Sequence, residues 1–157
     1  GGIGERKERL GAVVRLRPMI LNRQSRIRVP TGPLGSFLLD VKRALRLGGR
    51  DVTVCLVSDA EIARMNRKFR GKPKPTDVLS FPAHGNGTGP SAANLGDLAI
   101  APGVARRNAR RFGRTLPEEL RVLILHGVLH LVGYDHEADH GEMDRVEHRL
   151  RARLGLS

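Results

Sequence analysis

The residues His126-Gly-Val-Leu-His130-Leu-Val-Gly133-Tyr-Asp-His136 decide how this chain folds. They close an apolar segment, Leu120 to Val132, whose spacing predicts a core-facing helix. His126 and His130 are four positions apart, so on a helix they project from the same face, one turn apart. Gly133 can adopt the left-handed backbone conformation that ends a helix and turns the chain back. His136 could then return to the first two histidines.

Three imidazoles around one point make a catalytic zinc site, with the fourth position left for water. A single histidine on an apolar face is more often a hydrogen-bonded core residue, but three at this spacing favour a metal on this helix in the C-terminal half. Metzincin proteases share the spacing H-x-x-x-H-x-x-G-x-x-H. Their general base is a glutamate directly after the first histidine, and this chain has Gly127 there. Peptidase chemistry therefore lacks its base.

The composition indicates one globular domain with a polyanionic partner. The chain has 157 residues, of which 39% are hydrophobic, enough for a real core. The net charge of +12 is mostly arginine and favours nucleic acid first and an anionic membrane second. An arginine-rich genome would give the same excess without any partner. Aromatic residues make up 3%, which argues against extensive base stacking.

The sequence also predicts a cytoplasmic protein with a loose beginning. Cys55 is the one cysteine, which excludes a disulfide within the chain, and we expect it to be a small buried hydrophobe. No long apolar segment or hydrophobic signal region supports export. Residues 1–18 are rich in Gly and Arg. They predict a basic leader, either disordered or an added extension, before a domain at 19–157.

Strand patterns and helix patterns alternate along the domain, which predicts an α/β fold. The β-branched segment 51–57 predicts a buried strand, and Ser58 or Asp59 predicts the N-cap of the following helix. Strands are also predicted at 78–81 and 95–100, with an edge strand within 20–29 and a turn at 30–33. Helices are predicted at 34–47 and 59–69, and further helices begin at 102, at 116 and after 136.

Two basic segments are candidate substrate contacts. The proline-punctuated loop with Arg70, Lys72 and Lys74 is either a phosphate-binding lip or a rigid solvated connector, and the charge pattern favours neither. The helix beginning at Pro102 is a solvated face or an RNA-facing surface. It carries Arg106, Arg107, Arg110, Arg111 and Arg114. The candidate substrate-binding residues are Arg70, Lys72, Lys74, Arg106 and Arg110.

Two aspartates are candidates for supporting roles. Asp97 is unusual inside an apolar strand, where it could pair with Arg70, orient a ligand histidine, or bind at a sheet edge. Asp135 directly precedes His136 and could orient an imidazole N–H.

Four motifs together resemble the YbeY family of bacterial endoribonucleases. They are Arg70-Gly-Lys72, Thr76-Asp-Val-Leu-Ser-Phe-Pro82, Gly96-Asp97 and HGVLHLVGYDH at 126–136, in the order of the family. The resemblance covers roughly Ile20 to Leu156. It implies one α/β domain with a small, mixed, mostly parallel sheet flanked by about five helices.

The resemblance also implies a function. It implies one zinc ion on His126, His130 and His136 as catalytic metal ligands, and Arg70 as the functional arginine of the cleft. The implied activity is metal-dependent cleavage of single-stranded RNA, in maturation of the 3′ end of 16S ribosomal RNA and in ribosome quality control. Ribosomal RNA and the ribosome or its proteins would be the partners, with no DNA and no membrane expected.

On this interpretation Arg70 stabilises the charge that builds on the phosphate in the transition state. The general base stays open, since the RNA 2′-hydroxyl could itself be the nucleophile. Two alternatives remain: another zinc hydrolase, including an atypical peptidase, and a non-enzymatic RNA- or ribosome-binding protein with structural zinc. Structural sites normally close all four positions with Cys or His, and Cys55 is distant in sequence.

Overall fold

The computed structural model describes residues 19–72, 76–83, 93–135 and 139–156. Within these ranges the chain forms one α/β domain with a four-stranded sheet and five helices. The strands are β1 (Ile20–Asn22), β2 (Asp51–Leu56), β3 (Val78–Pro82) and β4 (Asn94–Ile100). The helices are α2 (Thr31–Ala44), α3 (Asp59–Arg70), α4 (Pro102–Phe112), α5 (Leu116–Leu131) and α6 (Glu142–Arg153).

The sheet has the order β1-β2-β4-β3. β1, β2 and β4 are parallel, and β3 runs antiparallel to β4 at one edge. The predicted mixed, mostly parallel sheet is therefore confirmed. The edge position of β3 matters for function, because one side of this strand has no neighbouring strand among the described residues and borders the cleft described below.

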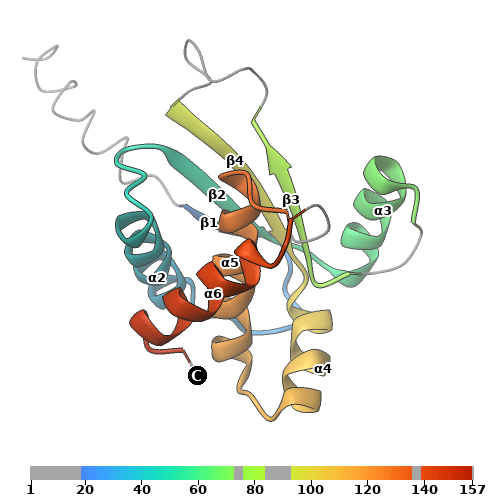
Figure 1. The fold of residues 1–157 in the computed structure, drawn as a ribbon. Helices are drawn as coiled ribbons and strands as arrows, with labels where there is room; N and C mark the ends of the chain where they lie inside the picture. Colours follow the sequence, from blue (N-terminus) through green and yellow to red (C-terminus); the bar gives the residue numbers. More distant parts are fainter. Residues whose placement is uncertain (1–18, 73–75, 84–92, 136–138, 157) are drawn as a thin grey trace, which may run out of the picture.

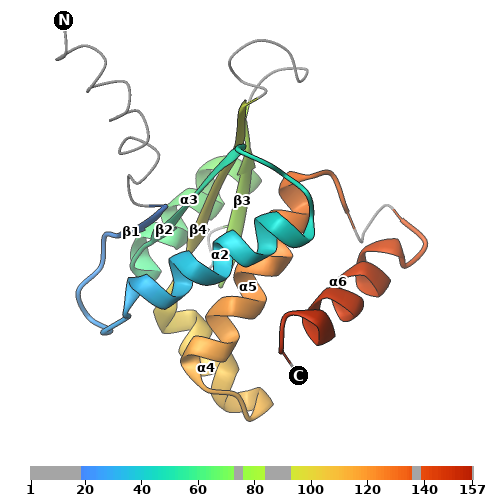
Figure 2. The same ribbon diagram turned by 90° about the vertical axis from the view of Figure 1, so that its left-hand side faces the viewer.

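The helices cover both faces of the sheet. α2 and α5 lie on one face and α3 lies on the other, as Figures 1 and 2 show from two directions. α6 packs on α5, and α4 contacts both α3 and α5. The main core lies between the sheet and α5, whose residues are buried on most sides, as expected for a helix that is apolar all round. A smaller cluster that includes Ile62 fills the space under α3.

Successive side chains of β2 point alternately to the two faces of the sheet and so to the two cores. Val52, Val54 and Leu56 are buried in the main core, whereas the residues between them are only partly buried. Cys55 is one of these intermediate residues and packs against the smaller cluster, so the cysteine expected to be buried is buried only in part. Its partial burial still raises the pKa of the thiol.

Two predicted boundaries were wrong. The predicted turn at 30–33 forms the start of α2 instead, with Pro30 as N-cap and Thr31 as the first helical residue. Pro33 fits there because the first turn of a helix leaves its N–H groups without intrahelical partners, so a missing N–H costs nothing. The predicted edge strand is ordered as a strand only over Ile20–Asn22.

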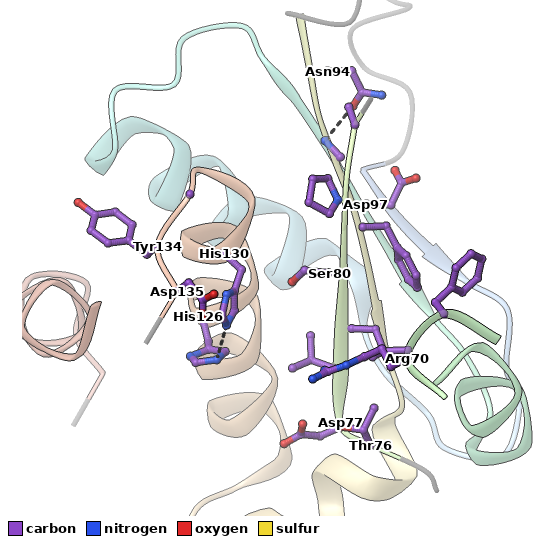
Figure 3. Close-up of a pocket in the computed structure, with 18 residues that line it drawn as sticks. Arg70, Thr76, Asp77, Ser80, Asn94, Asp97, His126, His130, Tyr134 and Asp135 are labelled. Carbon is purple, nitrogen blue, oxygen red and sulfur yellow. Dashed lines mark hydrogen bonds between the residues drawn. The ribbon is translucent and has the colours of Figure 1, made fainter. Parts of the chain in front are cut away.

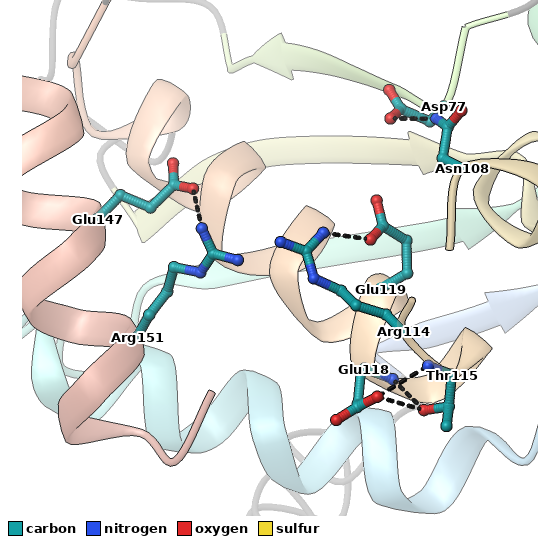
Figure 4. Close-up of polar contacts among 8 residues, drawn as sticks. All are labelled: Asp77, Asn108, Arg114, Thr115, Glu118, Glu119, Glu147 and Arg151. Atoms are coloured by element: carbon teal, nitrogen blue, oxygen red, sulfur yellow. Dashed lines mark hydrogen bonds and ion pairs between the residues drawn. The ribbon is translucent and has the colours of Figure 1, made fainter. Parts of the chain in front are cut away.

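Arg114 does not belong to the arginine-bearing helix as predicted. α4 ends at Phe112, because Gly113 takes the left-handed conformation with φ +69°. Arg114 instead donates to Glu119 at 2.7 Å, and Glu119 is only 4% exposed (Figure 4). Arg114 therefore neutralises a buried carboxylate at the start of α5, where Thr115 and Glu118 form a capping box.

The end of α5 is built as the sequence predicts. Gly133 has φ +109°. Its N–H donates to the carbonyl of His130, and the N–H of Tyr134 donates to the carbonyl of Leu129, both at 3.0 Å. These two bonds form the Schellman motif that closes many helices. Within the described ranges no helix has the length and apolar character needed to cross a membrane.

Candidate active site

A cleft of about 1180 Å³ runs along the edge strand β3. It is lined by β3, by the last turns of α5 and by the C-terminal end of α3, as Figure 3 shows. Three elements far apart in sequence therefore meet at one concave surface. The sequence-predicted residues Arg70, His126, His130, Asp97 and Asp135 all line this cleft.

The two described histidines meet in the cleft. The Nε2 atoms of His126 and His130 are 3.2 Å apart, and their rings stand nearly perpendicular, at 79°. The four-residue spacing on α5 thus places both imidazoles at one point, as predicted. His136 lies outside the described residues. Among the residues that are described, no three or more His, Cys, Asp or Glu side chains form a group that could hold a metal ion.

A carboxylate from another helix orients the first histidine. Nδ1 of His126 lies 2.8 Å from Oε1 of Glu147, which belongs to α6. Because a carboxylate accepts hydrogen bonds, Nδ1 carries the proton and the lone pair of neutral His126 is on Nε2, which faces the cleft. Burial opposes the charge of Glu147. The hydrogen bond from His126 and the positive charges nearby outweigh it and lower the pKa of Glu147. Figure 4 shows the nearest arginine, Arg151, beside Glu147.

Glu147 was missed in the sequence analysis, although a signal was present. It lies four residues after the buried Met143, at the border of the apolar face of α6. A carboxylate at this position is directed toward the protein rather than toward solvent, and its side chain is 14% exposed. Its partner, however, is 21 residues away in the sequence.

Arg70 enters the cleft from the opposite side. It is the last residue of α3, and Gly71 ends the helix with φ +70°. Figure 3 shows its side chain extending across β3 toward His126 and His130. Lys72 is exposed beyond the helix end and does not line the cleft. Lys74 lies outside the described residues.

The two predicted aspartates lie at different places in the cleft. Asp97 pairs with Phe81 in the β3–β4 ladder, so both side chains are on the α3 face of the sheet. The histidines lie on the other face, where the Ser80 hydroxyl donates to the carbonyl of Gly127 at 3.4 Å. No ion pair joins Asp97 to Arg70 in the described part of the chain. The carboxylate of Asp135 lies beside the two imidazoles (Figure 3).

The remaining predicted contacts, Arg106 and Arg110, lie away from the cleft. Both are exposed residues of α4, and neither lines the cleft. Arg106 instead lines a second cavity at the other end of α3.

Comparison with known proteins places the chain in a family. A family model described as Endoribonuclease YbeY matches residues 31–155. The chain belongs to the endoribonuclease YbeY family. The family name describes nucleases, which are hydrolases. "Endoribonuclease YbeY" of Solibacter usitatus is 52% identical over 108 residues, which cover 69% of each chain. The same-named protein of Koribacter versatilis is 44% identical over 138 residues, which cover 88% of this chain and 86% of the relative.

The fold agrees with a solved structure. The solution structure of TM1509 from Thermotoga maritima matches with a TM-score of 0.54 and 31% sequence identity. The match covers 86% of this chain and 88% of that one. The resemblance to the YbeY family stated from the motifs is therefore confirmed, together with the α/β fold that it implied.

Gly127 shows why this YbeY-family chain does not have the metzincin base. A Cβ at position 127 would lie 2.7 Å from Cδ2 of the buried Leu98, closer than such atoms approach. The position therefore faces the sheet and not the cleft. Even a glutamate there would point away from the two histidines, so the geometry, like the sequence, disfavours peptidase chemistry.

Aromatic side chains are concentrated in the cleft of this YbeY-family protein. The chain has four phenylalanines, one tyrosine and no tryptophan. Phe69, Phe81 and Tyr134 line the cleft. The rings of Phe69 and Phe81 stand edge to face with centroids 5.2 Å apart, and Phe69 is 59% exposed. Composition alone argued against extensive stacking and could not show that Phe69 and Phe81 pack together at the cleft.

Proposed function

We propose that the chain is a zinc-dependent endoribonuclease that cleaves single-stranded RNA in the cleft along β3. We further propose that it acts in the cytoplasm on the 3′ end of 16S ribosomal RNA, during maturation and quality control of the ribosome. One observation carries the proposal. Glu147 orients His126 so that its Nε2 meets Nε2 of His130 in a cleft that Arg70 enters from the other side.

The histidine pair fits a zinc ion. Two nitrogen ligands on one tetrahedral zinc, each at about 2.0–2.1 Å, are about 3.3 Å apart, and the observed separation of the two Nε2 atoms is 3.2 Å. A carboxylate that accepts from the other ring nitrogen is the usual support of a metal-binding histidine. In our proposal His126, His130 and His136 hold the ion. When bound, zinc supplies a Lewis acid that activates water or polarises a phosphate oxygen.

The other cleft residues have assignable tasks in this proposal. Arg70 binds the scissile phosphate and stabilises the negative charge that builds there in the transition state. Asp135 orients an imidazole beside it. The exposed Phe69 offers a ring face on which an unpaired base stacks, a mode of recognition that favours single strands over duplexes.

The decisive experiment combines cleavage with metal analysis. Purified protein is incubated with end-labelled single-stranded RNA and, separately, with the matching duplex, with and without a chelator. We expect cleavage of the single strand, loss of cleavage with chelator, recovery with zinc, and about one zinc ion per chain. Bound zinc without any cleavage would favour the non-enzymatic alternative, and chelator-resistant cleavage would contradict the metal.

Replacing Arg70 with alanine should lower the rate without removing the metal. Loss of one group that stabilises transition-state charge typically costs about 10²–10³ in kcat. Arg70→Lys should recover only part of the loss, because an ammonium lacks the bidentate fork of arginine. Single-turnover cleavage and zinc content are the two measurements.

The matched control is Arg67→Ala, which removes an exposed arginine of the same helix that does not line the cleft. We expect it to keep nearly the full rate. A large fall in zinc content of Arg70→Ala would contradict the assigned role and would mean that Arg70 is structural.

Replacing Glu147 with glutamine should weaken metal binding and change the histidine tautomer. The carboxamide lacks the negative charge that favours a proton on Nδ1 of His126, so Nε2 is no longer held as the lone-pair nitrogen. We expect zinc affinity to fall by about 10–100-fold. Competition with a chromophoric chelator measures the affinity, and nitrogen NMR of metal-free protein measures the tautomer.

Glu142→Gln serves as control, because Glu142 is an exposed carboxylate on the same helix. Unchanged zinc affinity in Glu147→Gln, with an unchanged His126 tautomer, would show that the contact is structural only.

A further inference from the structure

A second cavity, of about 1030 Å³, lies at the carboxyl ends of β1 and β2. Its walls are the loop at 22–27, the start of α3 and the first turns of α4. Its charged lining consists of four arginines, Arg23, Arg26, Arg106 and Arg107, and one carboxylate, Asp59. We call this cavity, with its four arginines, the arginine pocket.

The arginine pocket and the histidine cleft differ in charge. The described lining of the cleft contains one arginine, Arg70, against the three carboxylates of Asp77, Asp97 and Asp135. A polyanion gains little from the charge of such a cleft. Of these two cavities, the arginine pocket is the one in which the large positive charge of the chain concentrates.

Hydrogen bonds hold one wall of the pocket in place. The side-chain amide of Gln24 donates to Asn22 Oδ1 at 2.9 Å and to the carbonyl of Ile27 at 2.8 Å, and its oxygen accepts from the Ile27 N–H at 3.0 Å. The N–H of Arg23 donates to the carbonyl of Leu56 at 2.8 Å. The loop backbone that carries Arg23 and Arg26 is therefore fixed before any ligand arrives, which lowers the entropy cost of binding.

The facing wall is fixed as well. Arg107 donates to Asp59 at 3.0 Å, which joins the start of α3 to the first turns of α4. The fit is close, because a Cβ on Gly103 would lie 2.5 Å from Oδ1 of Asp59. Arg106 is exposed beside this pair and lines the pocket without a described ion pair of its own.

The chemistry of this lining selects phosphate groups rather than bases. Guanidinium groups bind phosphate oxygens in a bidentate manner. No aromatic residue lines the pocket, so it offers no ring for a base to stack on. Exposed arginines on two opposite walls suit several phosphates of an extended backbone better than one enclosed ion.

α3 connects the pocket to the histidine cleft. Its N-terminal residue Asp59 lines the pocket, and its C-terminal residues Phe69 and Arg70 line the cleft. A helix of 12 residues is about 18 Å long, a distance that several nucleotides of a single strand span.

We propose that Arg23, Arg26, Arg106 and Arg107 bind backbone phosphates of the RNA strand whose scissile bond lies in the histidine cleft. The arginine pocket then holds the strand by its charge, and the cleft carries out the cleavage. This proposal rests on the proposed endoribonuclease function. Arg106, predicted from the sequence as a substrate contact, then contacts the RNA in the arginine pocket and not in the cleft.

The test compares two triple variants that lose the same charge. The pocket variant carries Arg23→Ala, Arg26→Ala and Arg106→Ala and keeps Arg107 with its ion pair. The control carries Arg50→Ala, Arg149→Ala and Arg153→Ala, all exposed and all outside both cavities. Fluorescence anisotropy with a labelled 20-nucleotide single-stranded RNA, with cleavage blocked by chelator, gives Kd at several salt concentrations.

We expect the pocket variant to bind the RNA at least about 10-fold more weakly than the control, and its salt slope to fall by about 2, since each phosphate contact to a single strand contributes about 0.7. A four-nucleotide RNA is too short to reach both sites, so the wild type should bind it more weakly than it binds the 20-nucleotide RNA. Equal losses in pocket variant and control on the long RNA would overturn the proposal. So would a loss of binding to inorganic phosphate alone, with RNA binding unchanged.

A replacement variant and a measurement on the wild type cover the case of a misfolded pocket variant. If the pocket variant does not fold, the single exposed change Arg106→Glu replaces it, and the length dependence of wild-type binding needs no variant at all. Because binding is measured without cleavage, a wild-type protein that binds RNA at the pocket but never cuts it would refute the endoribonuclease function and leave the phosphate pocket standing.

Discussion

Replacing His130 with alanine is expected to abolish zinc binding and RNA cleavage together. The change removes one of the two nitrogens that meet at 3.2 Å in the cleft. The expected loss of rate is about 10³-fold or more, because a metal supplies several kcal/mol of transition-state stabilisation and each 1.36 kcal/mol is a factor of about ten. Zinc content by mass spectrometry and cleavage of labelled RNA are measured on the same sample.

The fold should survive this change. His130 is only partly buried, near the end of a helix whose core contacts come from other residues. Urea unfolding of metal-free His130→Ala should therefore resemble that of metal-free wild type. His148→Ala is the control, because His148 is exposed on α6 and does not line the cleft. Full RNase activity in metal-free His130→Ala would disprove the zinc-dependent mechanism.

Replacing Gly96 with alanine, which adds a single methyl group, is expected to destabilise the sheet strongly. Gly96 has φ +140°, and a Cβ there would lie 2.3 Å from the carbonyl oxygen of Phe81 and 2.9 Å from Cα of Pro82. Both are backbone atoms of β3, so the strand itself must move. Strain and overpacking together should cost about 2–5 kcal/mol in the free energy of unfolding, measured by urea denaturation.

Gly113→Ala separates the effect of backbone strain from the effect of overpacking. Gly113 also has positive φ, at +69°, but a Cβ there would meet nothing within 4 Å. It should lose only the conformational part, about 1 kcal/mol. Equal destabilisation by the two variants would mean that the contact with β3 is unimportant. Because β3 borders the cleft, we also expect Gly96→Ala to lose cleavage activity before it loses secondary structure.

The parts of the fold that follow from local patterns were predicted well. The apolar periodicity of α5, the glycine that ends it and the four-residue histidine spacing are all properties of neighbouring residues. The same holds for Ser58 as N-cap of α3. The turn expected at 30–33 failed, since Gly and Pro occur both in turns and in the first turn of a helix.

The parts that depend on packing could not be predicted. The contact of Glu147 with His126 requires α6 to dock on α5, and no local pattern gives that docking angle. The side of the sheet that Asp97 occupies depends on the register of β4, in which one residue of shift would turn it to the other face. The separation of Arg106 from the cleft depends on where α4 packs.

The tie between Glu147 and His126 also has a consequence for the order of assembly. A ribosome delivers α5 before α6, so the nascent chain contains His126 before the carboxylate that orients it. Until α6 docks, the imidazole of His126 is able to exchange between its two neutral tautomers. Docking of α6, through Met143 and Leu150 in the core, is thus the step that brings Glu147 to His126 and fixes the tautomer of its ring. The orientation of His126 is therefore fixed only after the last helix of the chain has been made and has packed on α5.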